Sequence, residues 1–119
     1  MRVSFSPDGK KLATCSYDKT MKLWDVASLQ CQATFEGHSG GVSDVSFSPD
    51  GKKLVSCSGD ETAKLWDVAS HKCDATFEGH SDSVNGVSFS ADGKKLASCD
   101  NDALVMLWDV ASLQGEVTF

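Results

Sequence analysis

The fold is decided by residues 37–67, which read GHSGGVSDVSFSPDGKKLVSCSGDETAKLWD. Over 45–48 apolar and small polar residues alternate, which is the pattern of a strand with one buried face. Pro49-Asp50-Gly51 then forms a turn, because Pro fixes φ, Asp bonds back to the backbone and Gly accepts a positive φ. Residues 54–58 and 62–67 are predicted to form the next two strands, with a second short turn between them.

A fourth strand is predicted over 73–77, after a longer connection over 68–72. Four short strands joined by tight turns form an antiparallel meander and not a βαβ unit. No stretch of the sequence has apolar residues at helical spacing over a useful length. The fold class is therefore predicted to be all-β.

This unit is repeated along the whole chain of 119 residues. Trp24, Trp66 and Trp108 lie 42 residues apart, and phenylalanines and cysteines recur at the same spacing. A fixed period in this range is typical of repeat architectures, whose units cannot bury their apolar faces alone. The three units are therefore predicted to stack on one another.

The overall charge narrows the choice of partners. The chain carries 11 Lys and Arg against 17 Asp and Glu, a formal charge of −6. This balance argues against binding to nucleic acid or to an anionic membrane surface, since both need a basic face. No apolar run is long enough to span a bilayer, and residues 1–7 do not resemble a signal peptide. We expect a soluble, cytoplasmic chain with no membrane partner.

The cysteines and histidines do not indicate a metal or cofactor. The five cysteines are an odd number and include no C-x-x-C pair, so neither a disulfide framework nor a thiolate zinc site is expected. As repeat positions in strands they are interpreted as small buried hydrophobic residues. The three histidines lack clustered carboxylates. The Gly-rich segment 37–41 lacks the Lys-Ser/Thr ending of a phosphate loop.

Three motifs recur in register and together carry a family resemblance. Gly-His occurs at 37–38 and 79–80, and Trp-Asp ends the third strand of every unit. Val-x-Phe-Ser-Pro-Asp-Gly occurs at 3–9 and 45–51, and at 87–93 with Ala91 in place of Pro. The chain resembles the WD40 family of β-propellers, whose repeat has this period and these signatures. The resemblance implies three four-stranded blades: 1–35 as blade 1, 36–77 as linker and blade 2, and 78–119 as linker and blade 3.

The resemblance also implies a hydrogen-bonded Asp-His-Ser/Thr-Trp tetrad in each blade. The implied members are Asp18, Thr14 and Trp24 in blade 1, Asp60, His38, Ser56 and Trp66 in blade 2, and Asp102, His80, Ser98 and Trp108 in blade 3. An Asp, a His and a Ser in one network invite comparison with a catalytic triad. Because the trio recurs in blades 2 and 3 and its Ser is bound to an indole N–H, we interpret it as structural and expect no catalytic residue.

Three blades are too few to close a propeller, which typically has about four to eight. Each end of the chain would expose one apolar blade face, and the two faces resemble the two sides of an internal contact. Head-to-tail joining gives a ring if the rotation closes, so a homo-oligomer is predicted. We expect a nine-bladed homotrimer in preference to a six-bladed dimer. The near identity of the blades resembles recently amplified or engineered arrays, and an engineered fragment of a longer array is favoured.

WD40 propellers bind partners on the face formed by the loops into first strands and the turns between second and third strands. The positions matching that face are Met1, Tyr17, Gly41, Ser43, Gly59, Ser83, Asn85 and Asn101. Of these only Tyr17 has the side-chain type that binding hot spots favour. The resemblance thus implies a generic protein–protein scaffold. The alternatives are a sensor or adaptor module of a larger signalling protein that binds a protein or peptide ligand on this face and, least favoured, an enzyme.

Overall fold

The computed structural model describes residues 2–118, and the side chains of residues 2–116. Every regular element in that part of the chain is a strand. The strands are β1 (Arg2–Phe5), β2 (Lys11–Cys15), β3 (Met21–Asp25), β4 (Gln30–Phe35), β5 (Val42–Phe47), β6 (Lys53–Ser58), β7 (Ala63–Asp67), β8 (Cys73–Phe77), β9 (Val84–Phe89), β10 (Lys95–Asp100), β11 (Val105–Asp109) and β12 (Gln114–Thr118). Nowhere in the described residues does a helix occur that could cross a membrane.

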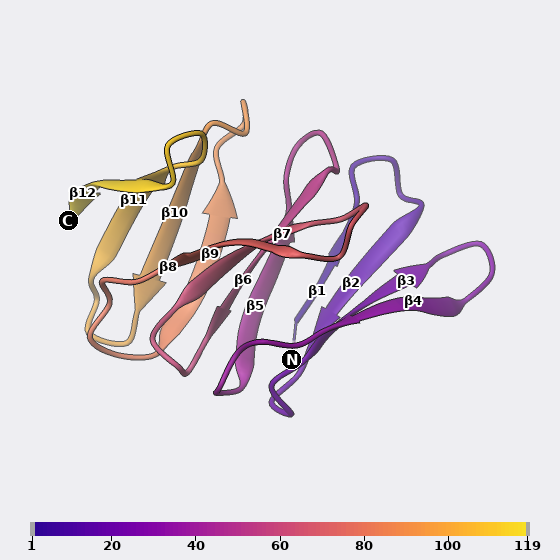
Figure 1. Ribbon diagram of the computed structural model, residues 1–119, viewed down its shortest axis with the longest axis horizontal. Coiled ribbons are helices and arrows are strands. Elements are labelled where there is room, and N and C mark those ends of the chain that lie inside the picture. Colours follow the sequence, from indigo (N-terminus) through magenta and orange to yellow (C-terminus); the bar gives the residue numbers. More distant parts are fainter. Residues whose placement is uncertain (1, 119) are drawn as a thin grey trace.

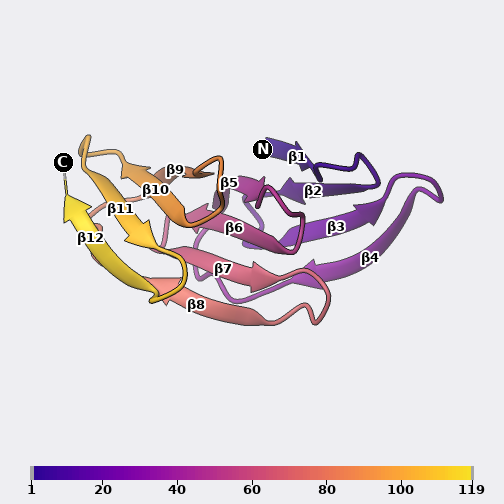
Figure 2. The ribbon, with the colours of Figure 1, turned by 90° about the horizontal axis from the view of Figure 1, so that it is seen from above.

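The strands form three separate four-stranded antiparallel sheets, each a meander in chain order: β1–β4, β5–β8 and β9–β12. Figure 1 shows the sheets side by side, with β1–β4 at one end and β9–β12 at the other. The first strands of successive sheets lie together, since β5 contacts both β1 and β9, while β4, β8 and β12 lie on the opposite, outer side (Figure 2). The predicted all-β class and the predicted meander are confirmed.

The first strand of the second sheet is longer than the sequence pattern predicts. β5 begins at Val42, and its pairing with β6 shifts register between Val42 and Asp44. The Val42 N–H donates to the carbonyl oxygen of Ser16 in the first sheet at 2.9 Å, and the Val42 side chain is fully buried. Contact with the neighbouring sheet therefore fixes this strand end.

The hydrophobic core lies between the sheets and not within them. One cluster joins the first sheet to the second and includes Met21, Leu23 and Phe35 from the first and Phe47 and Trp66 from the second. A corresponding cluster joins the second sheet to the third. Phe35 meets Trp66 with ring centroids 5.3 Å apart, and Phe77 meets Trp108 at 5.0 Å. Each sheet thus needs a neighbour on each face, as expected of stacked repeats.

The cysteines correct part of the sequence interpretation. Cys15 and Cys57 are buried in the contacts between sheets, but Cys31 and Cys73 are exposed and Cys99 is only half buried. Cys31 and Cys73 lie on the outer strands β4 and β8, where side chains meet solvent. All five thiols are free, and burial raises the pKa of Cys15 and Cys57.

Candidate functional site

The second sheet contains a continuous hydrogen-bonded chain from Asp60 to Trp66. His38 Nδ1 lies 2.9 Å from Asp60 Oδ2, and His38 Nε2 lies 2.7 Å from Ser56 Oγ. Trp66 Nε1 donates to the same serine oxygen at 2.8 Å. The structure thus brings together all four residues that the resemblance implied here. The linker before β5 supplies the histidine, and β6, the β6–β7 turn and β7 supply the others.

With a neutral histidine, one order of donors satisfies every member of this network. Nδ1–H of His38 donates to Asp60, the Ser56 hydroxyl donates to His38 Nε2, and Ser56 Oγ accepts the indole N–H. Burial lowers the pKa of His38, which favours this neutral form. Burial acts to raise the pKa of Asp60, but hydrogen bonds from Thr62, His38 and Ser39 outweigh it and hold that pKa below its ordinary value.

In the third sheet a different aspartate occupies the network, and the expectation for Asp102 is corrected. His80 Nδ1 lies 2.8 Å from Asp100 Oδ2, while His80 Nε2 meets Ser98 Oγ at 2.7 Å and Trp108 Nε1 donates to Ser98 Oγ at 2.9 Å. Asp102 is exposed, and the Ser81 hydroxyl donates to its carboxylate at 3.4 Å.

Two substitutions relative to the second sheet explain the change. Thr62 donates from its hydroxyl and its N–H to Asp60 Oδ1, and this holds Asp60 at the histidine. The equivalent residue in the third sheet is Leu104, which has no hydroxyl, and Asp100 replaces Ser58. Asp100 instead accepts the N–H groups of Asp102 and Leu104. Burial opposes ionisation of Asp100, but the bonds from His80 and these N–H groups keep its pKa lowered.

The first sheet contains only part of the implied network. Trp24 Nε1 donates to Thr14 Oγ1 at 3.0 Å. Asp18 is not hydrogen-bonded to either residue; its Oδ1 accepts the hydroxyl and the N–H of Thr20. These two bonds, the hydroxyl bond first, lower the pKa of Asp18. Asp18 is therefore ionised at neutral pH but stands apart from the Thr14–Trp24 pair.

The buried serines are poorly placed for nucleophilic chemistry. Ser56 is fully buried, and its oxygen is shared between an indole N–H and an imidazole nitrogen. Ser98 has the same two partners. A nucleophile needs a path to its substrate and a free lone pair directed at it. The hydrogen-bonded Asp, His and Ser side chains therefore serve to rigidify the blade.

The seven described residues expected on the partner-binding face lie together. Tyr17, Gly41, Ser43, Gly59, Ser83, Asn85 and Asn101 all line one open depression of about 430 Å³. Tyr17 is 75% exposed at its edge, and Asn85 donates to Asn101 at 2.6 Å. Arg2 also lines it and was not predicted, because its place follows from the position of β1 beside β5. Met1 lies outside the described residues.

The outward face of the first sheet, which we term the N-terminal end face, is apolar and uncovered. It consists of Val3, Phe5, Leu12, Trp24 and Val26, which align with residues of the second sheet that pack against the first. Phe5 is 61% exposed whereas the equivalent Phe47 is 7% exposed, and Val3 is 61% exposed whereas Val45 is 3% exposed. A depression of about 290 Å³ here extends from Phe5 to Leu29.

The opposite outward face, on the third sheet, is termed the C-terminal end face. It consists of Ala97, Cys99, Val105 and Leu107, which align with the buried residues Ala13, Cys15, Met21 and Leu23 of the first sheet. All four are only half buried. Phe119 aligns with Phe35 and Phe77, and it lies outside the described residues. The two end faces correspond to the two sides of an internal contact between sheets.

Comparison with known proteins identifies the family. The WD40 family model (WD domain, G-beta repeat) matches residues 1–25, 29–67 and 71–109. These three matches cover most of the chain. The protein belongs to the WD40 family. Its three sheets are WD40 blades, and the resemblance seen in the sequence motifs is confirmed.

Relatives with WD40 repeats match single stretches of the chain. The U5 small nuclear ribonucleoprotein 40 kDa protein of Pongo abelii is 38% identical over 45 residues, 38% of this chain and 13% of that protein. The Notchless protein homolog of Arabidopsis thaliana is 47% identical over 38 residues, 32% of this chain and 8% of that protein. The human WD repeat-containing protein 86 is 46% identical over 41 residues, 34% of this chain and 11% of that protein. The matched stretches span at most about an eighth of these relatives.

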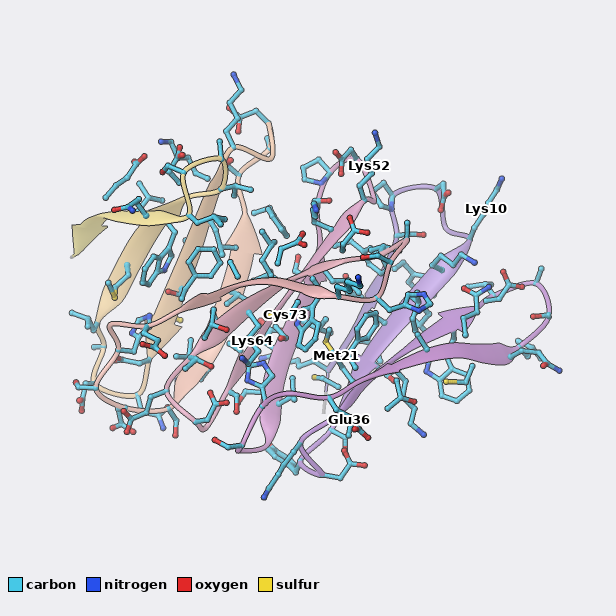
Figure 3. All side chains as sticks on the ribbon, viewed as in Figure 1. Lys10, Met21, Glu36, Lys52, Lys64 and Cys73 are labelled. Carbon is cyan, nitrogen blue, oxygen red and sulfur yellow. The ribbon has the colours of Figure 1, made fainter. Side chains whose placement is uncertain are left out.

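The aspartate of each Trp-Asp motif stabilises the same turn in its blade. Asp67 accepts a hydrogen bond from the Ser70 N–H at 2.8 Å and forms an ion pair with Lys53 at 3.0 Å. These two interactions lower the pKa of Asp67 to about 2. Asp25 and Asp109 make the equivalent contacts. Lys11, Lys53 and Lys95 are therefore held in ion pairs. Their chain neighbours Lys10 and Lys52 project from turns at the end of the molecule opposite Glu36 (Figure 3). Among the described residues no cluster of three potential metal ligands occurs.

Proposed function

We propose that this WD40 chain is a non-enzymatic interaction scaffold that assembles head to tail with copies of itself into a closed propeller. One observation carries the proposal: Phe5 and Val3 are largely exposed, whereas Phe47 and Val45 are buried against the preceding blade. The same residue types thus occur once without and once with a covering blade. Exposed apolar faces of this kind favour association.

The C-terminal end face of a second copy has the chemistry needed to cover the N-terminal end face. It offers small and aliphatic side chains at the positions that pack against Phe47 and Leu54 within the chain. Leu29, 80% exposed, aligns with His71, whose ring packs edge-on against Phe35 of the preceding blade at 5.8 Å. Leu29 would cover the neighbouring copy in the same way. The resulting interface is heterologous and forms a ring when the rotation closes.

The expected ring is a nine-bladed homotrimer. Nine blades need a rotation of about 40° each, near the value of about 45° in eight-bladed propellers. Six blades need about 60°, further from the value of about 51° at seven. Packed interfaces resist both compression and voids, so the smaller deviation is favoured.

A charge placed on the N-terminal end face tests this proposal. Phe5→Asp should shift the protein to the mass of one chain in light scattering, because an unpaired carboxylate would be buried in the interface. Thr34→Asp, which adds the same charge at an exposed position on β4, should leave the mass unchanged. Equal masses for both variants, each at a multiple of the chain mass, would argue against the end face as the interface.

A second candidate function is that of a sensor or adaptor with a protein or peptide ligand on the partner-binding face. The depression that contains Tyr17 supports it, because an exposed tyrosine beside small polar residues suits a binding hot spot. A ligand of this kind should lose affinity at least tenfold with Tyr17→Ala, whereas Phe5→Asp would change only the mass of the assembly.

The excess of acidic over basic residues and the free thiols support a cytoplasmic location. The near-identical sequences of the blades support an amplified or engineered origin.

A further inference from the structure

The bulge at the start of β9 leaves one asparagine outside the strand pairing of blade 3. Val84 pairs with Asp100 and Gly86 pairs with Cys99, so Asn85 between them has no partner residue on β10. The Asn85 side chain is exposed, whereas Val84 beside it is fully buried. The ladder is locally disrupted at a bulged residue. Asn85 therefore meets water at a position where the main chain is loosely paired.

The side-chain amide of Asn85 is held in a defined orientation. The Cys99 thiol donates to Asn85 Oδ1, with 3.3 Å between the sulfur and the oxygen, and Asn85 Nδ2 donates to Asn101 Oδ1 at 2.6 Å. A donor on a carbonyl oxygen stabilises the negative charge that develops there when a nucleophile attacks the carbon. The nucleophile next to this amide is the main-chain nitrogen of Gly86.

Gly86 lacks the side chain that would hinder such an attack. Closing a ring between Cγ of one residue and the main-chain nitrogen of the next requires rotation of the main chain, and glycine permits this rotation best because it has no Cβ. Asn101, the other asparagine of the chain, is followed by Asp102, which has a Cβ. In blade 2 the bulged residue is Ser43, which has no amide. This reactive pair is thus specific to blade 3.

Three Asp-Gly pairs, at 8–9, 50–51 and 92–93, have the same permissive glycine but a poorer target for attack. Hydrogen bonds from a serine hydroxyl and from a main-chain N–H lower the pKa of Asp8, Asp50 and Asp92, so these carboxyl groups are ionised at neutral pH. Attack on an ionised carboxylate would add a second negative charge to it. The neutral amide of Asn85 does not have this barrier.

We propose that Asn85 is a modification site at which the folded chain converts its own asparagine to aspartate and isoaspartate. The Gly86 nitrogen loses its proton to hydroxide and bonds to Asn85 Cγ. The Cγ–Nδ2 bond then breaks as Nδ2 takes up a proton from water, and ammonia leaves a five-membered succinimide. Water opens this ring at either carbonyl group and yields one of the two products. The reaction consumes only water and does not depend on assembly of the chain.

The conversion changes the partner-binding face. Asn85 lines the same depression as Arg2 and Tyr17, so either product adds a negative charge there, and the bond from Nδ2 to Asn101 is lost. Isoaspartate also adds a carbon to the main chain directly after the buried Val84. Modification therefore alters both the charge of this face and the path of β9.

The test is incubation of the full chain in mildly alkaline buffer at body temperature, with circular dichroism to verify that it stays folded. Peptide mass mapping should locate at residue 85 the mass gain that accompanies replacement of an amide by a carboxyl group. Asn101 in the same molecules is the internal control and should convert at least tenfold more slowly, because Asp102 hinders ring closure. The same chain in urea provides the rate for the unfolded state.

Two variants of β9 sharpen the result. Gly86→Ala should slow the conversion at least tenfold, because its Cβ hinders ring closure and would come within 2.9 Å of Cys99 Sγ, which displaces the thiol. Ser88→Ala, at an exposed position on the same strand, should leave the rate unchanged. The proposal is overturned if Asn85 stays intact in the folded chain while the chain in urea converts, if Asn101 converts equally fast, or if Gly86→Ala converts at the rate of the unmodified sequence.

Discussion

At the scale of single residues, two buried histidines each connect a carboxylate to a tryptophan through one serine. The His38 and His80 networks have nearly equal distances, although one uses Asp60 and the other Asp100. Each network ties a linker to the β-hairpin that follows it in the same blade. Removing one member leaves the others buried and without partners, which costs more than the lost bond itself.

Asp100→Ala should lower Tm by several degrees, because His80 and two N–H groups lose their acceptor. Asp102→Ala should leave Tm almost unchanged, since Asp102 is exposed and makes one long contact. Calorimetry of both variants measures the difference. Equal loss in the two, or a larger loss in Asp102→Ala, would contradict the placement of Asp100 in the network.

The free energy of unfolding should fall as the solution is acidified below about pH 6.5. Because burial lowers the pKa of His38, the unfolded chain takes up a proton in this range that the folded chain does not. Urea denaturation at about pH 7.5 and about pH 5.5 measures the decrease. His38→Ala should cost about 1–3 kcal/mol at the higher pH and show a smaller decrease between the two. An identical decrease in variant and wild type would exclude His38 as its source.

Repeat alignment points to Asp60, which lies beside His38, but it does not point to Asp100, which lies beside His80. Alignment places Asp102 opposite Asp60, and the structure departs from it because Leu104 cannot hold that carboxylate as Thr62 does. The loss of threonine and the gain of an aspartate two residues earlier were the available signals. Residue identity around the aligned position, and not the alignment itself, decides which carboxylate meets the histidine.

At the scale of elements, the contacts between sheets provide most of the stabilising burial. Phe77 ends β8 in blade 2 and packs against Trp108 of blade 3, so this strand end contributes to the core between the two blades. The start of β5 at Val42 depends on the same kind of contact, a bond to Ser16 of blade 1. Alternation of apolar residues locates the strands well, but it does not predict an end that is fixed by another blade.

Phe77→Ala should destabilise the protein by about 3–5 kcal/mol, because it leaves a cavity beside Trp108. Thr76→Ala, at the neighbouring exposed position on β8, should change stability by about 0.5 kcal/mol or less. Chemical denaturation monitored by tryptophan fluorescence distinguishes the two. A small effect of Phe77→Ala would show that blades 2 and 3 are not held by this contact.

At the scale of the whole molecule, the N-terminal end face and the C-terminal end face are exposed at opposite ends. Within the chain, the equivalent faces of neighbouring blades pack against each other. The sequence predicts this arrangement because a repeat of constant length gives every blade the same two faces. It does not predict the size of the ring, because that depends on the rotation between blades. The residues of the N-terminal end face were also missed as a site, since Phe5 and Leu12 look like ordinary core residues until the covering blade is considered.

The most direct test of self-assembly is native mass spectrometry of the unmodified chain, whose mass is 12.7 kDa. We expect a species of three chain masses that persists on dilution, because each chain closes the ring at both of its end faces. A species of two chain masses would indicate a six-bladed ring and would contradict the nine-bladed one. A stable single chain would contradict the proposal that this protein completes its propeller with copies of itself.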